Sequence, residues 1–146
     1  MTQTLPEQAF KATFQQTDTM PGSTVLSMKL AFTPAADGGW QASGSAEVVR
    51  GSTNPPLELS FPVQGTLLVE ATEIMPPSYA LHLHSHFPDG RLGTSLDVKL
   101  VTRSATPPPS AAELTFTGEY IWLAGEPVTV RNATVQMTNE SGPNAG

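Results

Sequence analysis

The chain has 146 residues, enough for one domain to bury a core without disulfides or a structural metal. Seven basic residues, scattered singly, stand against thirteen acidic ones, and the formal charge of −6 argues against nucleic acid and anionic membranes as partners. The absence of cysteine excludes disulfides, thiolate chemistry and cysteine-based zinc sites. With 14 prolines and 12 glycines, the composition is typical of β-strands separated by turns.

Nothing in the sequence marks a segment for export or for the membrane. The start, residues 1–7, lacks the basic residues and apolar run of a secretory signal. No stretch approaches the roughly 20 apolar residues of a membrane helix. We therefore expect a soluble, cytoplasmic protein with one β domain over residues 1–138 and a flexible tail over 139–146.

Apolar residues recur at every second position in the first third of the chain, which predicts strands. A first strand is expected within residues 7–17. Two further strands form a hairpin around the glycine-containing connection 34–39, which must hold an odd number of residues if the apolar faces are to match. The alternating apolar residues of that hairpin are Leu26, Met28, Leu30 and Phe32, followed by Trp40, Ala42, Gly44, Ala46 and Val48.

The longest alternating segment covers residues 57–71 and would extend roughly 45 to 50 Å at about 3.3 Å per residue. A strand of that length must bend in a small domain. Gly65, at an inward position, is the expected place for a bend or a bulge. Pro62 lacks an N–H group and is expected at an edge, a bulge or a broken ladder.

The segment 79–100 is predicted to form a hairpin around Asp89-Gly90, because Asp-Gly tolerates the positive φ angles of a type I′ turn. A two-residue turn there sets Leu83 opposite Leu96. On the other face it places His82 opposite Asp97 and His84 opposite Ser95.

The last third of the chain continues the alternation. One face of a strand carries Leu114, Phe116, Gly118, Tyr120 and Trp122. After residue 130 the apolar residues change parity, which predicts a bulge near Arg131-Asn132. About eight antiparallel strands with short connections predict an all-β meander, as an up-and-down barrel first and a two-sheet sandwich second.

The stretch 44–69 resembles a small bacterial all-β domain family of unknown function, above all in Asn54-Pro55-Pro56-Leu57 and Val63-Gln64-Gly65. The resemblance covers less than half of the chain. It implies a bacterial source and a β-rich fold, and it carries no activity, substrate or catalytic residue.

The three histidines form the one cluster of residues with suggestive chemistry. His-x-His on a strand is a metal-ligand spacing, because side chains two residues apart share a face and imidazole suits zinc, copper or nickel. The candidate metal ligands are His82, His84, His86 and Asp97. The simpler interpretation, which we favour, is a solvated outer face with His82 and Asp97 as a pair, and no cofactor.

Aromatic residues at inward positions give a second candidate site. They are expected to be core in a filled barrel, and in an open barrel they would line a pocket for a small apolar molecule. The candidate ligand-binding residues are Trp40, Tyr79, Phe116, Tyr120 and Trp122. We found no motif for a catalytic nucleophile, for paired carboxylates or for phosphate-binding glycines, and therefore predict no catalytic residue.

Three hypotheses follow from these observations. The first is a non-enzymatic β-barrel or sandwich module that binds a small apolar ligand or a protein partner. The second is a metal-dependent protein, which includes an enzyme, using the face of His82, His84 and Asp97. The third is an oligomeric structural module joined through exposed strand edges or proline-rich loops.

Overall fold

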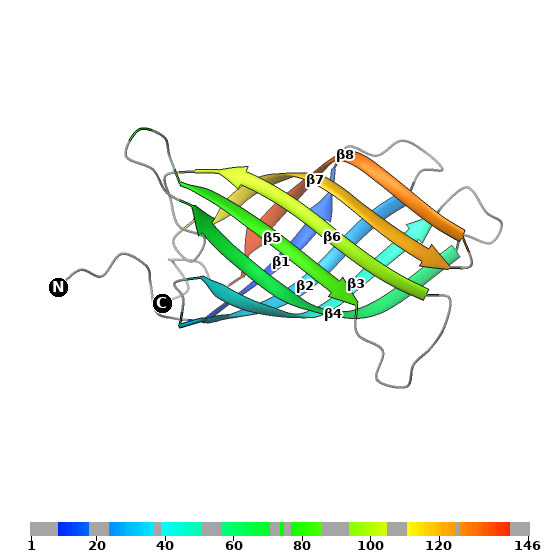
Figure 1. Ribbon diagram of the computed structural model, residues 1–146, viewed down its shortest axis with the longest axis horizontal. Coiled ribbons are helices and arrows are strands. Elements are labelled where there is room, and N and C mark those ends of the chain that lie inside the picture. The colour runs from blue at the N-terminus through cyan, green and yellow to red at the C-terminus, as the bar shows by residue number, and fades with distance from the viewer. Residues whose placement is uncertain are drawn as a thin grey trace.

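The protein is a closed barrel of eight antiparallel strands that follow one another around the ring in chain order (Figure 1). The computed structural model describes residues 9–17, 24–36, 39–50, 57–70, 74, 77–85, 94–104, 111–124 and 126–140. The up-and-down barrel is confirmed, and the sandwich alternative is wrong. The strands are β1 (Phe10–Gln16), β2 (Thr24–Pro34), β3 (Trp40–Arg50), β4 (Leu57–Glu70), β5 (Ser78–Ser85), β6 (Thr94–Arg103), β7 (Glu113–Ala124) and β8 (Glu126–Asn139).

The barrel closes because β1 pairs with β2 on one side and with β8 on the other. The backbone hydrogen bonding between β1 and β8 continues one residue past the end of β8, where the Glu140 N–H donates to the Lys11 carbonyl oxygen at 2.8 Å. Residues 139 and 140, assigned to the tail by the sequence, therefore lie on the barrel, and residues 141–146 lie outside the described part of the chain. No helix within the described residues has the length and apolar character needed to cross a membrane.

Alternation along each strand separates the interior from the outer surface. Side chains two residues apart share a face of a strand, and the apolar face of every strand turns inward. The interior contains aromatic and aliphatic side chains that are at most 3% exposed, among them Phe14, Phe32, Leu67, Leu83, Val98, Phe116 and Val135. Rings contact one another across the barrel: the Phe14 and Phe116 centroids are 5.7 Å apart.

The hairpin of β2 and β3 has the predicted matching of faces. Its register runs from Pro34↔Trp40 to Thr24↔Arg50, so five residues lie between the last paired positions. An odd number keeps Leu30, Phe32 and the other inward residues of β2 beside the inward residues of β3. Residues 37 and 38 of that connection lie outside the described part of the chain.

β4 is the long strand that the sequence predicts, and it curves around the barrel (Figure 1). Gly65 lies where the β5 backbone is close to β4, since a Cβ there would collide with the His82 carbonyl oxygen, and the registers with β3 and β5 continue through Gly65 without a bulge. Pairing with β5 begins at Val63↔Ser85, so Pro62 sits just beyond the described end of that ladder. Gly65 therefore lies where the absence of a Cβ is needed, and Pro62 lies where the absence of an N–H is tolerated.

The predicted register of β5 and β6 is wrong by two residues. Leu83 pairs with Val98 rather than Leu96, and His84 rather than His82 lies directly opposite Asp97. The shift is even, so every side chain keeps its predicted face. The predicted turn at Asp89-Gly90, together with His86, falls outside the described residues.

The bulge predicted in β8 is confirmed. The β7–β8 register changes between Gly118↔Ala133 and Tyr120↔Val130, so β8 contains one extra residue opposite Glu119. Asn132 has φ 56° at this point. Asparagine is one of the few residues that accept this left-handed conformation, which explains its presence in the bulge.

Candidate functional site

The five aromatic residues proposed to bind a ligand all face the interior, and each is at most 2% exposed. They do not gather at one place. Because β3 begins and β7 ends at opposite ends of the meander, Trp40 and Trp122 lie near opposite ends of the barrel. Tyr79 lies at the Trp40 end, Tyr120 lies near Trp122, and Phe116 lies between the two pairs. One pocket lined by all five is therefore not formed.

Both tryptophans carry a buried hydrogen-bond donor without an acceptor. Trp40 and Trp122 each have an indole Nε1 atom that is shielded from solvent and has no hydrogen-bond partner. An unpaired buried donor costs about 1 to 3 kcal/mol of desolvation. Such atoms are rare in native proteins, so these two are the places in the interior where an acceptor group would be stabilised.

Another polar group of the interior is hydrogen-bonded, and sequence reasoning missed it. The Gln16 Oε1 atom accepts a hydrogen bond from the Tyr120 hydroxyl at 2.6 Å and another from the Leu26 N–H at 3.0 Å. Gln16 is only 6% exposed. These bonds join β1 to β2 and, across the interior, to β7. The only sequence signal was a glutamine at an inward position of the first strand.

Tyr79 has a perturbed ionisation equilibrium. Desolvation by burial raises the pKa of its phenol above the ordinary value of 10.0. The neutral form is therefore favoured in the folded protein, which suits a side chain packed in an apolar interior.

The histidine face lies on the outside of the barrel. His82 Nε2 is 3.4 Å from Asp97 Oδ1, and the two side chains are 53% and 47% exposed. His84 is directly opposite Asp97 and is exposed as well. Within the described residues no three His, Cys, Asp or Glu side chains come together to hold a metal ion. His84 and Asp97 thus lie on the outer surface of the barrel and not in its interior.

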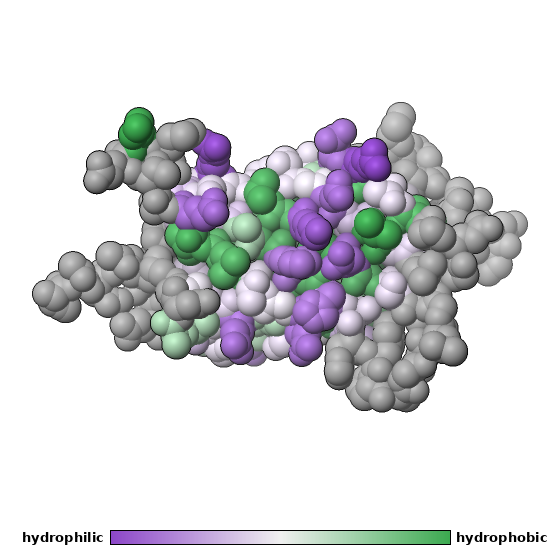
Figure 2. Space-filling model, in the orientation of Figure 1, coloured by the Kyte–Doolittle hydropathy of each residue, from purple (hydrophilic) through white to green (hydrophobic). Residues whose placement is uncertain are grey.

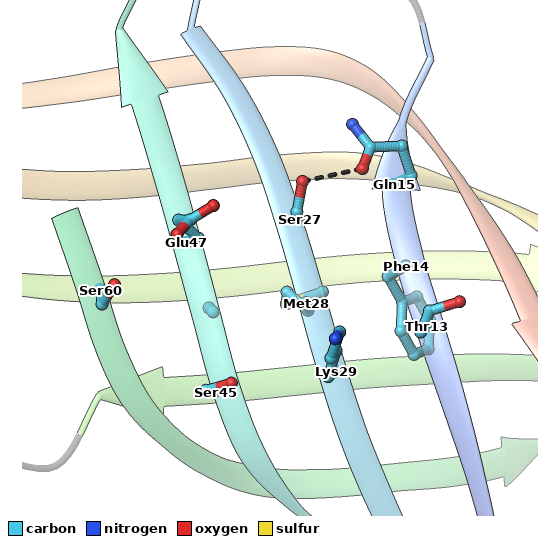
Figure 3. A pocket seen from close by; sticks show the side chains of 10 residues that line it. Thr13, Phe14, Gln15, Ser27, Met28, Lys29, Ser45, Glu47 and Ser60 are labelled. Carbon is cyan, nitrogen blue, oxygen red and sulfur yellow. Dashed lines mark hydrogen bonds between the residues drawn. The ribbon is translucent and has the colours of Figure 1, made fainter. Parts of the chain in front are cut away.

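A polar groove of about 480 Å³ crosses the outer surface of β1 to β4. Its lining is mainly hydroxyl and amide groups, with one lysine and one glutamate, Lys29 and Glu47 (Figure 3). The Ser27 hydroxyl donates to Gln15 Oε1 at 2.8 Å, so part of this surface is bonded to itself. Short side chains on neighbouring strands account for the hollow without requiring a ligand.

A second groove, of about 500 Å³, crosses β4 to β8 and has a different lining. Its lining includes a row of apolar side chains that lie side by side on three neighbouring strands, since Leu68 pairs with Ala80 and Ala80 pairs with Val101. Leu68 is 44% exposed and Val101 is 54% exposed. In Figure 2, apolar surface lies over the left-hand halves of β4 and β6, next to hydrophilic side chains. We call Leu68, Ala80 and Val101 the apolar row.

Charged residues border the apolar row on both sides. The next outward positions toward one end of the barrel are Glu70, Ser78 and Arg103, and toward the other end Thr66, His82 and Lys99. Lys99 is also directly opposite Glu119 of β7. The sequence contained a signal for this row that was missed. Leu67-Leu68 and Leu100-Val101 are adjacent apolar pairs that interrupt the alternation.

No family model matches the chain, and a search of curated proteins finds no similar sequence. The resemblance over residues 44–69, with the bacterial source it implies, therefore stays a prediction. Function has to be argued from the geometry of the barrel.

Proposed function

We propose that this protein is a non-enzymatic β-barrel module that binds another protein chain through the outer face of β4 to β6. The observation that carries this proposal is the apolar row. Single exposed apolar residues are ordinary on protein surfaces, but a contiguous apolar patch with a polar rim is typical of an interaction site. Leu68, Ala80 and Val101 form such a patch across three strands, in a protein whose other outward positions are mostly polar.

Closure of the barrel also supports binding through a face. Every strand has a paired neighbour on each side, although β1 covers only part of β8, so assembly through strand edges, which the sequence left open, has little edge to use. We therefore expect binding to use side chains on the outer surface. On the strands of the barrel, the apolar row places two of the exposed large apolar side chains, Leu68 and Val101, on either side of Ala80.

The proposal can be tested with a photoactivatable amino acid placed at Val101 and, as the matched control, at Ser45. Both positions are exposed and outward-facing, on β6 and β3 respectively. Irradiation in the native cells is expected to give a discrete protein adduct from position 101 and none from position 45. Equal adducts from the two positions, or none from position 101, would contradict the proposal.

A small apolar molecule with one hydrogen-bond acceptor is a second candidate ligand, supported by the unpaired indole groups of Trp40 and Trp122. A carbonyl or carboxylate oxygen placed beside either Nε1 atom would remove the cost of burying that donor. Native mass spectrometry of freshly purified, untagged protein tests this idea. A retained small molecule that is lost in Trp40→Phe or Trp122→Phe supports it, and an apo mass in every preparation excludes it.

A further inference from the structure

We infer that the chain bound by the apolar row is a second copy of this protein, packed face to face around a two-fold axis that passes by Ala80. The inference rests on the proposed function and names its partner. It is drawn from the positions of apolar and charged residues across β4, β5 and β6.

The apolar row is symmetric about its centre. Ala80 lies on β5, with Leu68 on one neighbouring strand and Val101 on the other. A two-fold axis parallel to β5 exchanges β4 and β6 between two facing copies. Leu68 of each copy then covers Val101 of the other, while the two Ala80 residues meet at the axis. Such an isologous contact uses the same patch twice, as most homodimers do.

The small side chain of Ala80 allows this approach. A larger residue at the centre would hold the two convex barrels apart, whereas a methyl group lets the flanking Leu68 and Val101 side chains reach across. The row is then apolar against apolar along its whole length, and its exposed area is removed from water.

Charges beside the row match under the same rotation. Glu70 and Arg103 occupy equivalent positions on β4 and β6, on either side of Ser78. The two-fold axis brings Glu70 of each copy over Arg103 of the other, which gives two opposite-charge contacts per dimer. On the other side of the row, Lys99 faces the neutral Thr66 of the second copy, and His82 faces His82. Complementary charges of this kind fix the orientation of a complex more than they raise its affinity.

The local balance of charge allows two copies to approach through this face. The chain has a formal charge of −6, so two copies repel one another on average. Around the apolar row, by contrast, Lys99 and Arg103 offset Glu70 and Glu119. Two copies that approach through these strands therefore meet less repulsion than their net charge implies. Since a closed barrel is convex, contact is limited to about three strands, and we expect a dimer that dissociates on dilution.

The first test is sedimentation equilibrium of the purified chain over a range of concentrations. Wild type is expected to form dimers, Val101→Glu to stay monomeric at the same concentrations, and Ile121→Glu to dimerise like wild type. Ile121 is the matched control because it is also apolar, outward and 38% exposed, but lies on β7 outside the row. Thermal unfolding of each variant verifies that it is folded.

The second test is a charge exchange. Glu70→Arg and Arg103→Glu are each expected to weaken dimerisation, because each places like charges over one another, and the double variant is expected to recover it. Mixing the two single variants separates contacts between chains from contacts within one chain, because the mixed dimer regains both opposite-charge contacts while each chain keeps like charges at positions 70 and 103. A wild-type protein that is monomeric throughout, equal effects of Val101→Glu and Ile121→Glu, or no recovery in the double variant would overturn the inference.

Failure of the dimer and failure of the proposed function give different results. If the purified chain is monomeric but the probe at Val101 still captures a different protein in cells, the second copy is excluded and the interaction face stands. If the probe captures nothing, both proposals fail. An adduct with the mass of two copies supports both.

Discussion

The two faces of β4 to β7 contain similar residues in opposite environments. Leu67 is 1% exposed and its neighbour Leu68 is 44% exposed. The same contrast holds between Leu100 and Val101, and between Tyr120 and Ile121. An apolar side chain is therefore not evidence for the core by itself. Burial follows the parity of the position in the strand, and outward apolar residues point to function only where several lie side by side, as Leu68, Ala80 and Val101 do.

The largest effect is expected inside the barrel at Gly65. Gly65→Val places a side chain against the His82 backbone, and we expect the variant to lose more than about 4 kcal/mol of unfolding free energy or to fail to fold. Thr66→Val is the outward control on the same strand and is expected to change stability by less than about 0.5 kcal/mol. Urea unfolding followed by tryptophan fluorescence measures both. Similar stabilities would show that β4 can move away from β5 at this point.

The two leucines of β4 provide the next comparison. Leu67→Ala leaves a cavity in the packed interior and is expected to cost about 2 to 5 kcal/mol. Leu68→Ala removes a half-exposed side chain and is expected to cost less than about 1 kcal/mol, when measured on the monomer at high dilution. A Leu68→Ala variant as unstable as Leu67→Ala would place Leu68 in the fold rather than in a binding face.

Sequence reasoning reached the faces of the strands more reliably than their registers, and the hairpin of β5 and β6 shows why. Alternation has a period of two residues, so it excludes an odd shift but cannot distinguish Leu83 opposite Leu96 from Leu83 opposite Val98. The bulge in β8 was predictable because an odd insertion changes the parity of the apolar residues that follow. Its exact position was marked by an asparagine that tolerates positive φ.

Contacts between residues far apart in the sequence could not be predicted from local patterns. The bond between Gln16 and Tyr120 joins residues 104 positions apart, and it exists only because β1 closes the barrel. The predicted aromatic site was also wrong as one pocket. Residues that share the inward face can lie at different heights along the barrel axis, and alternation along a strand does not show that height. For the histidine site, the outward face and the side-chain pair of His82 and Asp97 were predicted correctly, whereas the register that placed these two residues directly opposite each other was wrong.

The hydrogen bond of Tyr120 is expected to have a moderate effect. Tyr120→Phe keeps the ring but removes the hydroxyl that donates to Gln16, so we expect a loss of about 1 kcal/mol. The loss stays small because Gln16 Oε1 still accepts the Leu26 N–H. Chemical denaturation measures the change. A loss above about 3 kcal/mol would show that this bond holds β1 in the barrel.

Tyr79 should make stability depend on alkaline pH. Burial raises the pKa of Tyr79 in the folded state above 10.0, so the unfolded chain releases this proton at lower pH than the folded chain does. The free energy of unfolding should therefore fall as pH rises past about 10 and stop falling once the folded phenol also ionises. Tyr79→Phe should remove this part of the slope. An unchanged slope in the variant would assign it to other groups.

The smallest effect is expected on the outer face, between His82 and Asp97. Their side chains are about half exposed, so water and salt screen the interaction, and a double-mutant cycle with His82→Ala and Asp97→Ala should give a coupling of only about 0.2 to 1 kcal/mol. Differential scanning calorimetry at low ionic strength suits such a small difference. A coupling of several kcal/mol would require a third group that binds both side chains, and a metal ion would then be the first candidate. A small coupling would mean that His82 and Asp97 are ordinary surface residues. The apolar row would then be the part of this face whose exposure the fold does not explain, and burial against a second chain is the explanation to test.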